Sequence, residues 1–168
     1  MKRIKDIVLI ALLTTILIVQ EYLLGFLPNV QLTFFLIVLF SKCLGLIKTS
    51  IICIIYILLD GFLSGGMGLI FMPFMLIGLL IIPLSLNTIF KKIDSSFCLA
   101  LLGILFAFIY SFINIIPGCI MFDMSFYEYL LGDITWEIIL AINNFISIFI
   151  LYKPCRKMFN NVLKKEGF

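Results

Sequence analysis

Long apolar stretches, separated by short polar or turn-forming segments, follow one another along the whole chain. A stretch of about 17 to 25 apolar residues is long enough to cross a bilayer as a helix. The pattern predicts six membrane-spanning helices: Ile7–Leu27, Gln31–Ile47, Thr49–Ser64, Met67–Phe90, Phe97–Ile116 and Asp133–Tyr152. The second and third are at or just below the minimum length, so a re-entrant hairpin there is an alternative that leaves the ends on the same sides.

Three connections on one side of the predicted bundle carry turn-forming or aromatic residues. Pro28 is expected to stop the first helix, and Asn29 to open a turn. Asp60–Gly68 contains four glycines and predicts a mobile hinge. Pro117–Gly132 is aromatic and acidic, and it predicts an interfacial segment lying over the bundle.

Composition places the chain among integral membrane proteins. Of its 168 residues 64% are hydrophobic and 12% charged, whereas a soluble domain carries about 25% charged residues. The spans leave no room for a soluble module, so residues 1–168 are expected to form one membrane domain. A secretory signal peptide is disfavoured, since the first apolar run is too long and others follow it.

The charges are segregated in a way that orients the predicted helices. With both termini in the cytoplasm, all 12 basic residues fall in cytoplasmic segments, which is the distribution that the positive-inside rule describes. They are Lys2, Arg3, Lys5, Lys42, Lys48, Lys91, Lys92, Lys153, Arg156, Lys157, Lys164 and Lys165. Asp94 or Ser95 is expected to cap the fifth helix. The sequence therefore predicts a multi-pass protein of the cell membrane.

Residue types exclude several kinds of chemistry. The chain has no histidine, and its five cysteines show no C-x-x-C spacing, so we expect neither a metal site nor a cofactor. It has no G-x-S-x-G nucleophile motif and no G-x-x-x-x-G-K-[ST] nucleotide motif. An enzyme and a nucleic-acid partner are therefore not expected.

Polar residues recur on one face of several predicted spans, where each is costly without a partner or a cavity. The stripes are Asp133, Glu137, Ala141 and Asn144 on the sixth span, Gly103, Ala107, Tyr110 and Asn114 on the fifth, Tyr56, Asp60 and Ser64 on the third, and Gln20 with Glu21 on the first. Their convergence predicts a pocket that opens outward. The candidate substrate-binding residues are Glu21, Asn29, Asp60, Tyr110, Asn114, Trp136, Glu137, Asn143 and Asn144.

Each of these features has a structural alternative. Asn143 and Asn144 can serve as interhelical hydrogen-bond partners, Asp133 as a helix cap, and Trp136 as an aromatic residue of the membrane interface. The small pair Ala11 and Thr15 on the first helix fits either packing inside the bundle or docking of another membrane protein.

The chain resembles the substrate-binding S component of an energy-coupling factor transporter. The resemblance extends over nearly the full length and includes the I-A-L-L-T-T-I-L run of the first helix, Phe26–Val30, the glycine-rich turn after the third span, Asn144-Phe145 and Tyr152-Lys153-Pro154. It implies capture of a vitamin-like compound near the outer surface. It also implies association with a membrane coupling protein and two cytoplasmic ATPases. The family's A-x-x-x-A docking patch is matched by Ala11, and Thr15 replaces its second alanine.

The expected substrate follows from electrostatics. No lysine or arginine lies in the predicted outer half, and six carboxylates do, which disfavours an anion. We expect a neutral or cationic compound with a ring stacked on Trp136 or Tyr110. Riboflavin, thiamine or its pyrimidine, and a queuine-type precursor fit better than biotin, folate or pantothenate. The main alternative function is a six-span scaffold of the cell-shape or envelope machinery, and an intramembrane enzyme ranks below it.

Overall fold

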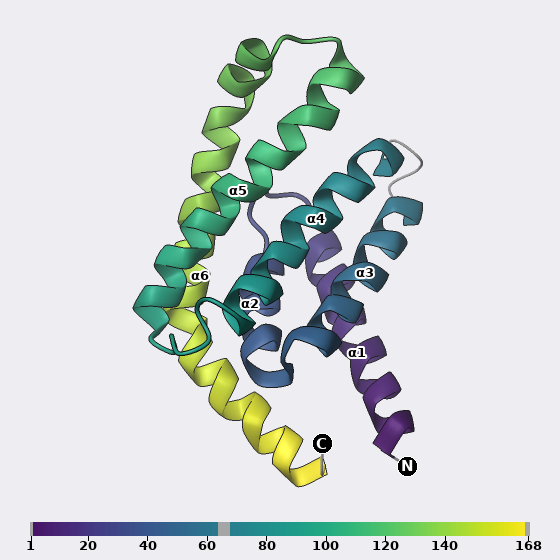
Figure 1. The fold of residues 1–168 in the computed structure, drawn as a ribbon, viewed down its shortest axis with the longest axis vertical. Helices are drawn as coiled ribbons and strands as arrows, with labels where there is room; N and C mark the ends of the chain where they lie inside the picture. The colour runs from purple at the N-terminus through teal and green to yellow at the C-terminus, as the bar shows by residue number, and fades with distance from the viewer. Residues whose placement is uncertain (1, 64–67, 167–168) are drawn as a thin grey trace.

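The computed structural model describes residues 2–63 and 68–166, and every regular element in this part of the chain is an α-helix. The six helices run alternately up and down in Figure 1. Their bounds are α1 Lys2–Leu24, α2 Thr33–Leu44, α3 Leu46–Leu63, α4 Gly68–Asn87, α5 Ser96–Phe122 and α6 Phe126–Glu166. The all-helical prediction is confirmed for the described residues.

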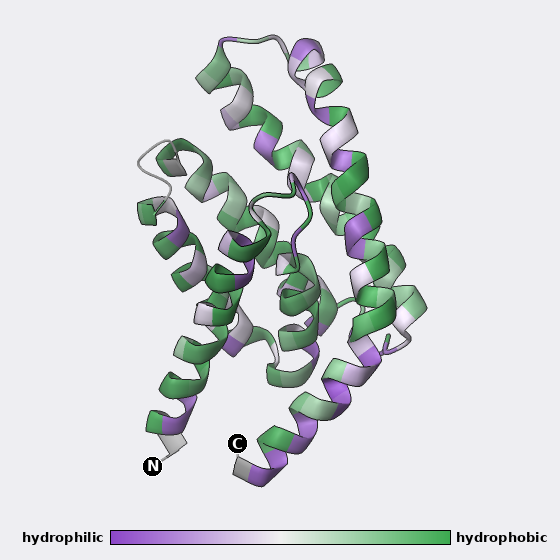
Figure 2. Ribbon diagram, turned by 180° about the vertical axis from the view of Figure 1, so that it is seen from behind, coloured by the Kyte–Doolittle hydropathy of each residue, from purple (hydrophilic) through white to green (hydrophobic). Residues whose placement is uncertain are grey.

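Five of the helices, all except α2, are long and apolar enough to cross a membrane. Large apolar side chains remain exposed along the outside of these helices, and most of the ribbon is coloured as hydrophobic in Figure 2. A surface of this kind is stable in lipid and costly in water. The chain is accordingly a multi-pass membrane protein.

The short helix α2 lies in the centre of the bundle. It has 12 residues, a length of about 18 Å at about 1.5 Å per residue, and it packs against all five other helices. Its buried residues are Thr33, Phe34, Phe35, Ile37, Val38, Leu39, Phe40 and Ser41. A helix that is apolar all round is expected to be buried. The second predicted span is thus a short core helix preceded by a non-helical segment, residues 25–32.

The prediction that Pro117–Gly132 forms an interfacial segment lying over the bundle is wrong. Helix α5 continues through Pro117 to Phe122, and α6 already begins at Phe126. A proline removes one backbone donor, whereas ending the helix in an apolar environment would leave several backbone groups unpaired. The segment therefore lengthens the α5–α6 hairpin, which extends beyond the other helices in Figure 1.

The start of α6 is set by a capping box. The backbone N–H of Ser125 donates to Glu128 Oε2 over 2.9 Å, and the Ser125 hydroxyl donates to the same oxygen over 2.7 Å. The S-x-x-E spacing is the usual signature of this cap. Asp133, which was one candidate for the cap of the last helix, lies inside α6 instead.

The other predicted turns are partly confirmed. Asn29 adopts a left-handed backbone conformation with φ of 58°, while α1 ends at Leu24, before Pro28. Ser95 occupies the N-cap position of α5, although its side chain makes no capping hydrogen bond. Asp60–Leu63 belongs to α3, and the remainder of the predicted glycine hinge, residues 64–67, lies outside the described residues.

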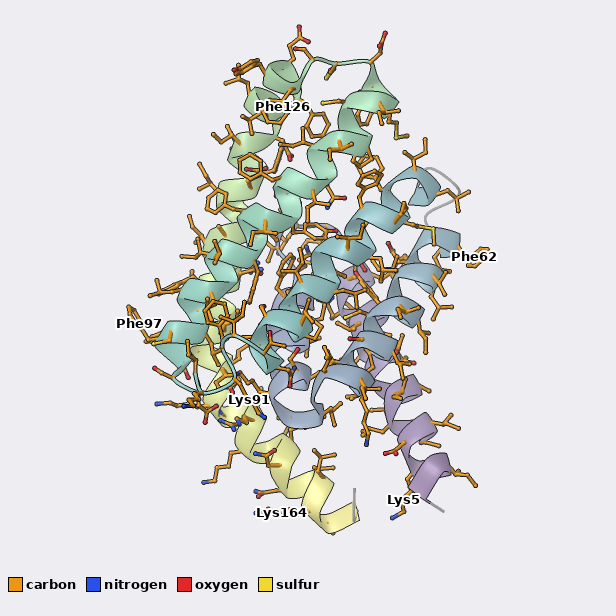
Figure 3. The ribbon with its side chains drawn as sticks, in the orientation of Figure 1. Lys5, Phe62, Lys91, Phe97, Phe126 and Lys164 are labelled. Carbon is orange, nitrogen blue, oxygen red and sulfur yellow. The ribbon has the colours of Figure 1, made fainter. Side chains whose placement is uncertain are left out.

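Both chain ends lie at the same end of the bundle (Figure 1), together with Lys5, Lys91 and Lys164 (Figure 3). We call this the basic end. The lower part of α6 changes direction there and slopes beneath the bundle toward α1 (Figure 1). Pro154 lies inside α6 in this region, and an interior proline is a common cause of a helix bend.

Candidate functional site

A cavity of about 340 Å³ lies under the connection between α1 and α2, and all six helices contribute to its lining. The lining residues are Glu21, Leu24, Gly25, Leu27, Pro28, Asn29, Val30, Gln31, Thr33, Phe34, Tyr56, Met75, Leu79, Tyr110, Ser111, Asn114, Asp133 and Leu140. Residues 25–32, which we call the α1–α2 loop, form one wall of the cavity, and several of them are exposed. The cavity therefore reaches the surface at this loop.

Three side chains hold the α1–α2 loop in place. The buried Gln20 accepts a hydrogen bond from the backbone N–H of Leu32 over 2.8 Å and donates to the Thr33 hydroxyl over 2.8 Å. Asn143 of α6 donates to the backbone oxygen of Gln31 over 2.6 Å. Asn29 in turn donates to the Trp136 backbone oxygen over 2.9 Å. The loop is fixed to α1, α2 and α6, so it forms a preorganised wall of the cavity.

The acidic groups of the cavity come from opposite helices. Glu21 of α1 accepts a hydrogen bond from the Tyr56 hydroxyl of α3 over 2.6 Å, and Asp133 of α6 also lines the cavity. Glu137, one turn after Asp133, is 3% exposed and does not line the cavity, and its Oε1 atom has no partner among the described residues. A buried carboxylate without a counter-charge is costly. Glu21 and Asp133, which line the cavity, favour a ligand with a positive charge or with hydrogen-bond donors.

Aromatic side chains form another part of the wall. The rings of Phe34 and Tyr110 meet edge to face, with centroids 5.3 Å apart and planes at 86°. Tyr56, which holds Glu21, lies in the same lining. Aromatic faces next to carboxylates can accommodate both a flat ring and a cationic group.

The structure brings four of the candidate binding residues to the cavity: Glu21, Asn29, Tyr110 and Asn114. Asp60 is half-buried on α3, one turn beyond Tyr56. The Trp136 side chain is 41% exposed, and Asn143 acts as a tether of the α1–α2 loop. Of the two rings proposed for stacking, Tyr110 lines the cavity and Trp136 does not. Whether any of them contacts a substrate stays a prediction.

Asn144 has an unusual environment. It is 0% exposed in the α5–α6 interface, close to Gly103, and neither atom of its amide has a partner among the described residues. An amide buried in this way costs about 1 to 3 kcal/mol. Its isolation does not support the alternative of a direct interhelical hydrogen bond.

Replacing Asn144 with leucine is expected to raise the free energy of unfolding by about 1 kcal/mol, because the unpaired amide is removed at similar volume. The measurement is the thermal midpoint of the purified protein in detergent. Replacement of the buried, hydrogen-bonded Ser147 by alanine serves as the control, and it is not expected to stabilise. A lower midpoint for Asn144→Leu would mean that the amide has a partner in the folded protein.

Ala11 and Thr15 lie on an exposed part of α1, and the Thr15 hydroxyl donates to the Ala11 backbone oxygen over 2.9 Å. The inward face of the same helix is formed by Leu13, Thr14, Leu17 and Gln20. The small pair is exposed and is not packed against another described helix, which does not support the packing alternative. Docking of another membrane protein stays a prediction.

Several lining residues were not among the candidates. Gln31, Thr33 and Ser111 supply polar groups, and Met75 and Leu79 of α4 supply an apolar wall. The loop and α4 carry little polar patterning in the sequence, so nothing in their periodicity marked them. Among the described residues, no group of three His, Cys, Asp or Glu side chains is arranged to hold a metal ion.

Comparison with known proteins does not identify a relative. No family model, curated protein or solved structure matches the chain. The function is therefore inferred from the geometry of the cavity and the charges around it.

Proposed function

We propose that the chain is the substrate-binding membrane subunit of an importer of the energy-coupling factor type. It captures a neutral or cationic heterocyclic vitamin or vitamin precursor. The observation that carries the proposal is the cavity of about 340 Å³ under the tethered α1–α2 loop. Small-molecule sites commonly measure about 300 to 1,000 Å³. The cavity is at the lower end of that range, which fits a small heterocyclic compound.

The distribution of charge supports the choice of substrate. Glu21 and Asp133 line the cavity, while Lys5, Lys91 and Lys164 lie at the opposite, basic end of the bundle. A cation therefore enters a favourable field and an anion does not. A ligand whose ring stacks on Tyr110 and whose charged or donor group points toward Glu21 would contact both the aromatic and the acidic part of the cavity wall.

In this proposal the basic end faces the cytoplasm, as the positive-inside rule requires, and the cavity faces outward. The chain then crosses the cell membrane six times with both termini inside. The α1–α2 loop and α2 together make the second crossing, because α2 alone is shorter than the hydrocarbon thickness of about 30 Å.

Delivery requires partners. The exposed surface around Ala11 and Thr15 is available to a membrane coupling protein, and small residues allow close helix contact. Two cytoplasmic ATPases that bind the coupling protein would supply the energy. The chain itself carries no catalytic residue in this proposal.

The test is ligand binding by the purified protein in nanodiscs. We expect thiamine, its pyrimidine moiety or riboflavin to raise the thermal midpoint and to change the fluorescence of Trp136, whose backbone accepts the hydrogen bond from the α1–α2 loop. Biotin and pantothenate, which are anions, are expected to have no effect. Strict preference for an anion would contradict the substrate class, and absence of binding across a broad vitamin panel would favour the six-span scaffold.

A further inference from the structure

A second cavity, of about 320 Å³, lies at the basic end of the bundle. Apart from Leu86 its lining is polar or charged: Ser41 and Lys42 of α2, Asn87, Lys91 and Asp94 around the α4–α5 connection, and Arg156 of α6. It is separate from the cavity under the α1–α2 loop, with which it shares no lining residue. The proposed import function makes no use of it.

The lining has three cations and one carboxylate, an excess of two positive charges. Asp94 accepts a hydrogen bond from the Tyr152 hydroxyl over 2.8 Å and forms an ion pair with Arg156. Burial alone would raise the pKa of Asp94, but the hydrogen bonds from Arg156 and Tyr152 outweigh it and hold that pKa below its usual value. Asp94 is therefore ionised at neutral pH and already engaged, which leaves the excess positive charge to attract an anion.

One donor of this cavity is buried and unused: the Arg156 Nε atom has no partner among the described residues. Lys91 lines the same cavity and is exposed, so an anion can reach its ammonium group. Lys42, by contrast, is fixed, because its ammonium donates to the backbone oxygens of Leu86 and Phe90 over 3.2 and 2.8 Å. A buried donor without an acceptor is costly. An anion with several oxygens satisfies Arg156 and Lys91 together.

The residues beside this cavity indicate which kind of molecule carries the anionic group. Ile89 is 78% exposed and Phe97 is 52% exposed, at the ends of the same connection that carries Lys91. Figure 3 shows Lys91 and Phe97 at the same side of the basic end. Phe97 also packs edge to face on Phe145 and Phe149, with ring centroids 6.2 and 6.4 Å apart. A charged cavity bordered by an apolar surface is the arrangement that a phospholipid needs for its headgroup and chains.

We propose that the cavity between α2, the α4–α5 connection and α6 binds the phosphate of an anionic phospholipid. The phosphate oxygens accept from Arg156 Nε and Lys91, and the acyl chains lie along Ile89 and Phe97. This site would hold the bent lower part of α6 to the inner leaflet. It does not depend on the import function proposed above.

The test is native mass spectrometry of the delipidated, full-length protein titrated with phosphatidylglycerol or phosphatidylcholine. We expect tighter binding of phosphatidylglycerol, and a loss of about fivefold in its affinity for Lys91→Gln, the effect of one basic residue at a membrane surface. Lys92→Gln is the matched control, because Lys92 is the next residue in the same connection and does not line the cavity. Equal affinity for the two lipids, or equal loss in the two variants, would overturn the proposal.

Two further measurements separate this site from less specific attraction. Arg156→Lys keeps the charge and the possible ion pair with Asp94 but removes Nε, so we expect weaker binding of phosphatidylglycerol with an unchanged thermal midpoint. Unchanged affinity in this variant would contradict the role of Nε. Soluble glycerol 3-phosphate is expected to compete poorly with phosphatidylglycerol for the site. Displacement of the lipid at equal concentrations would assign the site to a free phosphate compound and overturn the proposal that it binds a phospholipid.

Discussion

Replacing Gln20 with leucine is expected to lower the free energy of unfolding by about 2 to 3 kcal/mol. Gln20 is buried and uses both ends of its amide: the oxygen accepts from the Leu32 backbone N–H, and the nitrogen donates to Thr33 and to the Leu17 backbone oxygen. Leucine would fill the space but leave the Leu32 backbone N–H without its acceptor and the Thr33 hydroxyl without its donor. Thr33 is buried and Leu32 is only partly exposed, so water replaces the lost hydrogen bonds incompletely.

The same substitution is expected to weaken ligand binding, because Gln20 anchors the wall of the cavity at the start of α2. The measurements are the thermal midpoint in nanodiscs and the affinity for whichever vitamin binds in the panel. Gln31→Leu is the control: Gln31 lines the same cavity, but among the described residues its side chain accepts one bond, from Thr33 over 3.2 Å. A Gln20→Leu protein as stable as the Gln31→Leu protein would show that the anchor is unimportant.

The sequence predicted most of the helices because their apolar stretches are long and their charges are segregated. The errors occur where local signals conflict. Pro117 is usually a helix terminator, yet helix continuation satisfies more backbone groups in an apolar environment. The capping box of Ser125 and Glu128 was visible as an S-x-x-E spacing and would have placed the start of α6 correctly.

The candidate site was predictable only in part, because four of the nine candidate residues line the cavity and the polar residues Gln31, Thr33 and Ser111 were not among the candidates. Glu21 and Tyr110 stood out as polar residues within apolar sequence, and both line the cavity. The α1–α2 loop is held by hydrogen bonds such as that from Asn143 to the Gln31 backbone, 112 residues apart in the chain. A contact between a side chain and a distant backbone oxygen leaves no periodic signal, because any residue can supply the oxygen.

The charge of Glu21 provides the most direct test of the proposed substrate class. Replacing Glu21 with glutamine removes the charge but keeps an oxygen that can accept the hydrogen bond from Tyr56. A charged hydrogen bond contributes about 1.5 to 3 kcal/mol. We therefore expect a loss of at least about tenfold in affinity for the best-binding cationic compound of the panel, since about 1.4 kcal/mol corresponds to a factor of ten. Affinity for a neutral ring compound is expected to change far less.

Glu128→Gln is the matched control for Glu21→Gln. Both variants remove one carboxylate, and glutamine at position 128 is compatible with the capping box, but Glu128 is exposed and does not line the cavity. Titration calorimetry at neutral pH compares the two variants with the unchanged protein. Equal losses in both would indicate that the summed negative charge of this part of the protein matters, and not a contact with Glu21. A loss confined to Glu21→Gln, with an unchanged thermal midpoint, requires the cation to contact Glu21, because a packing defect would reduce stability and the binding of neutral compounds as well.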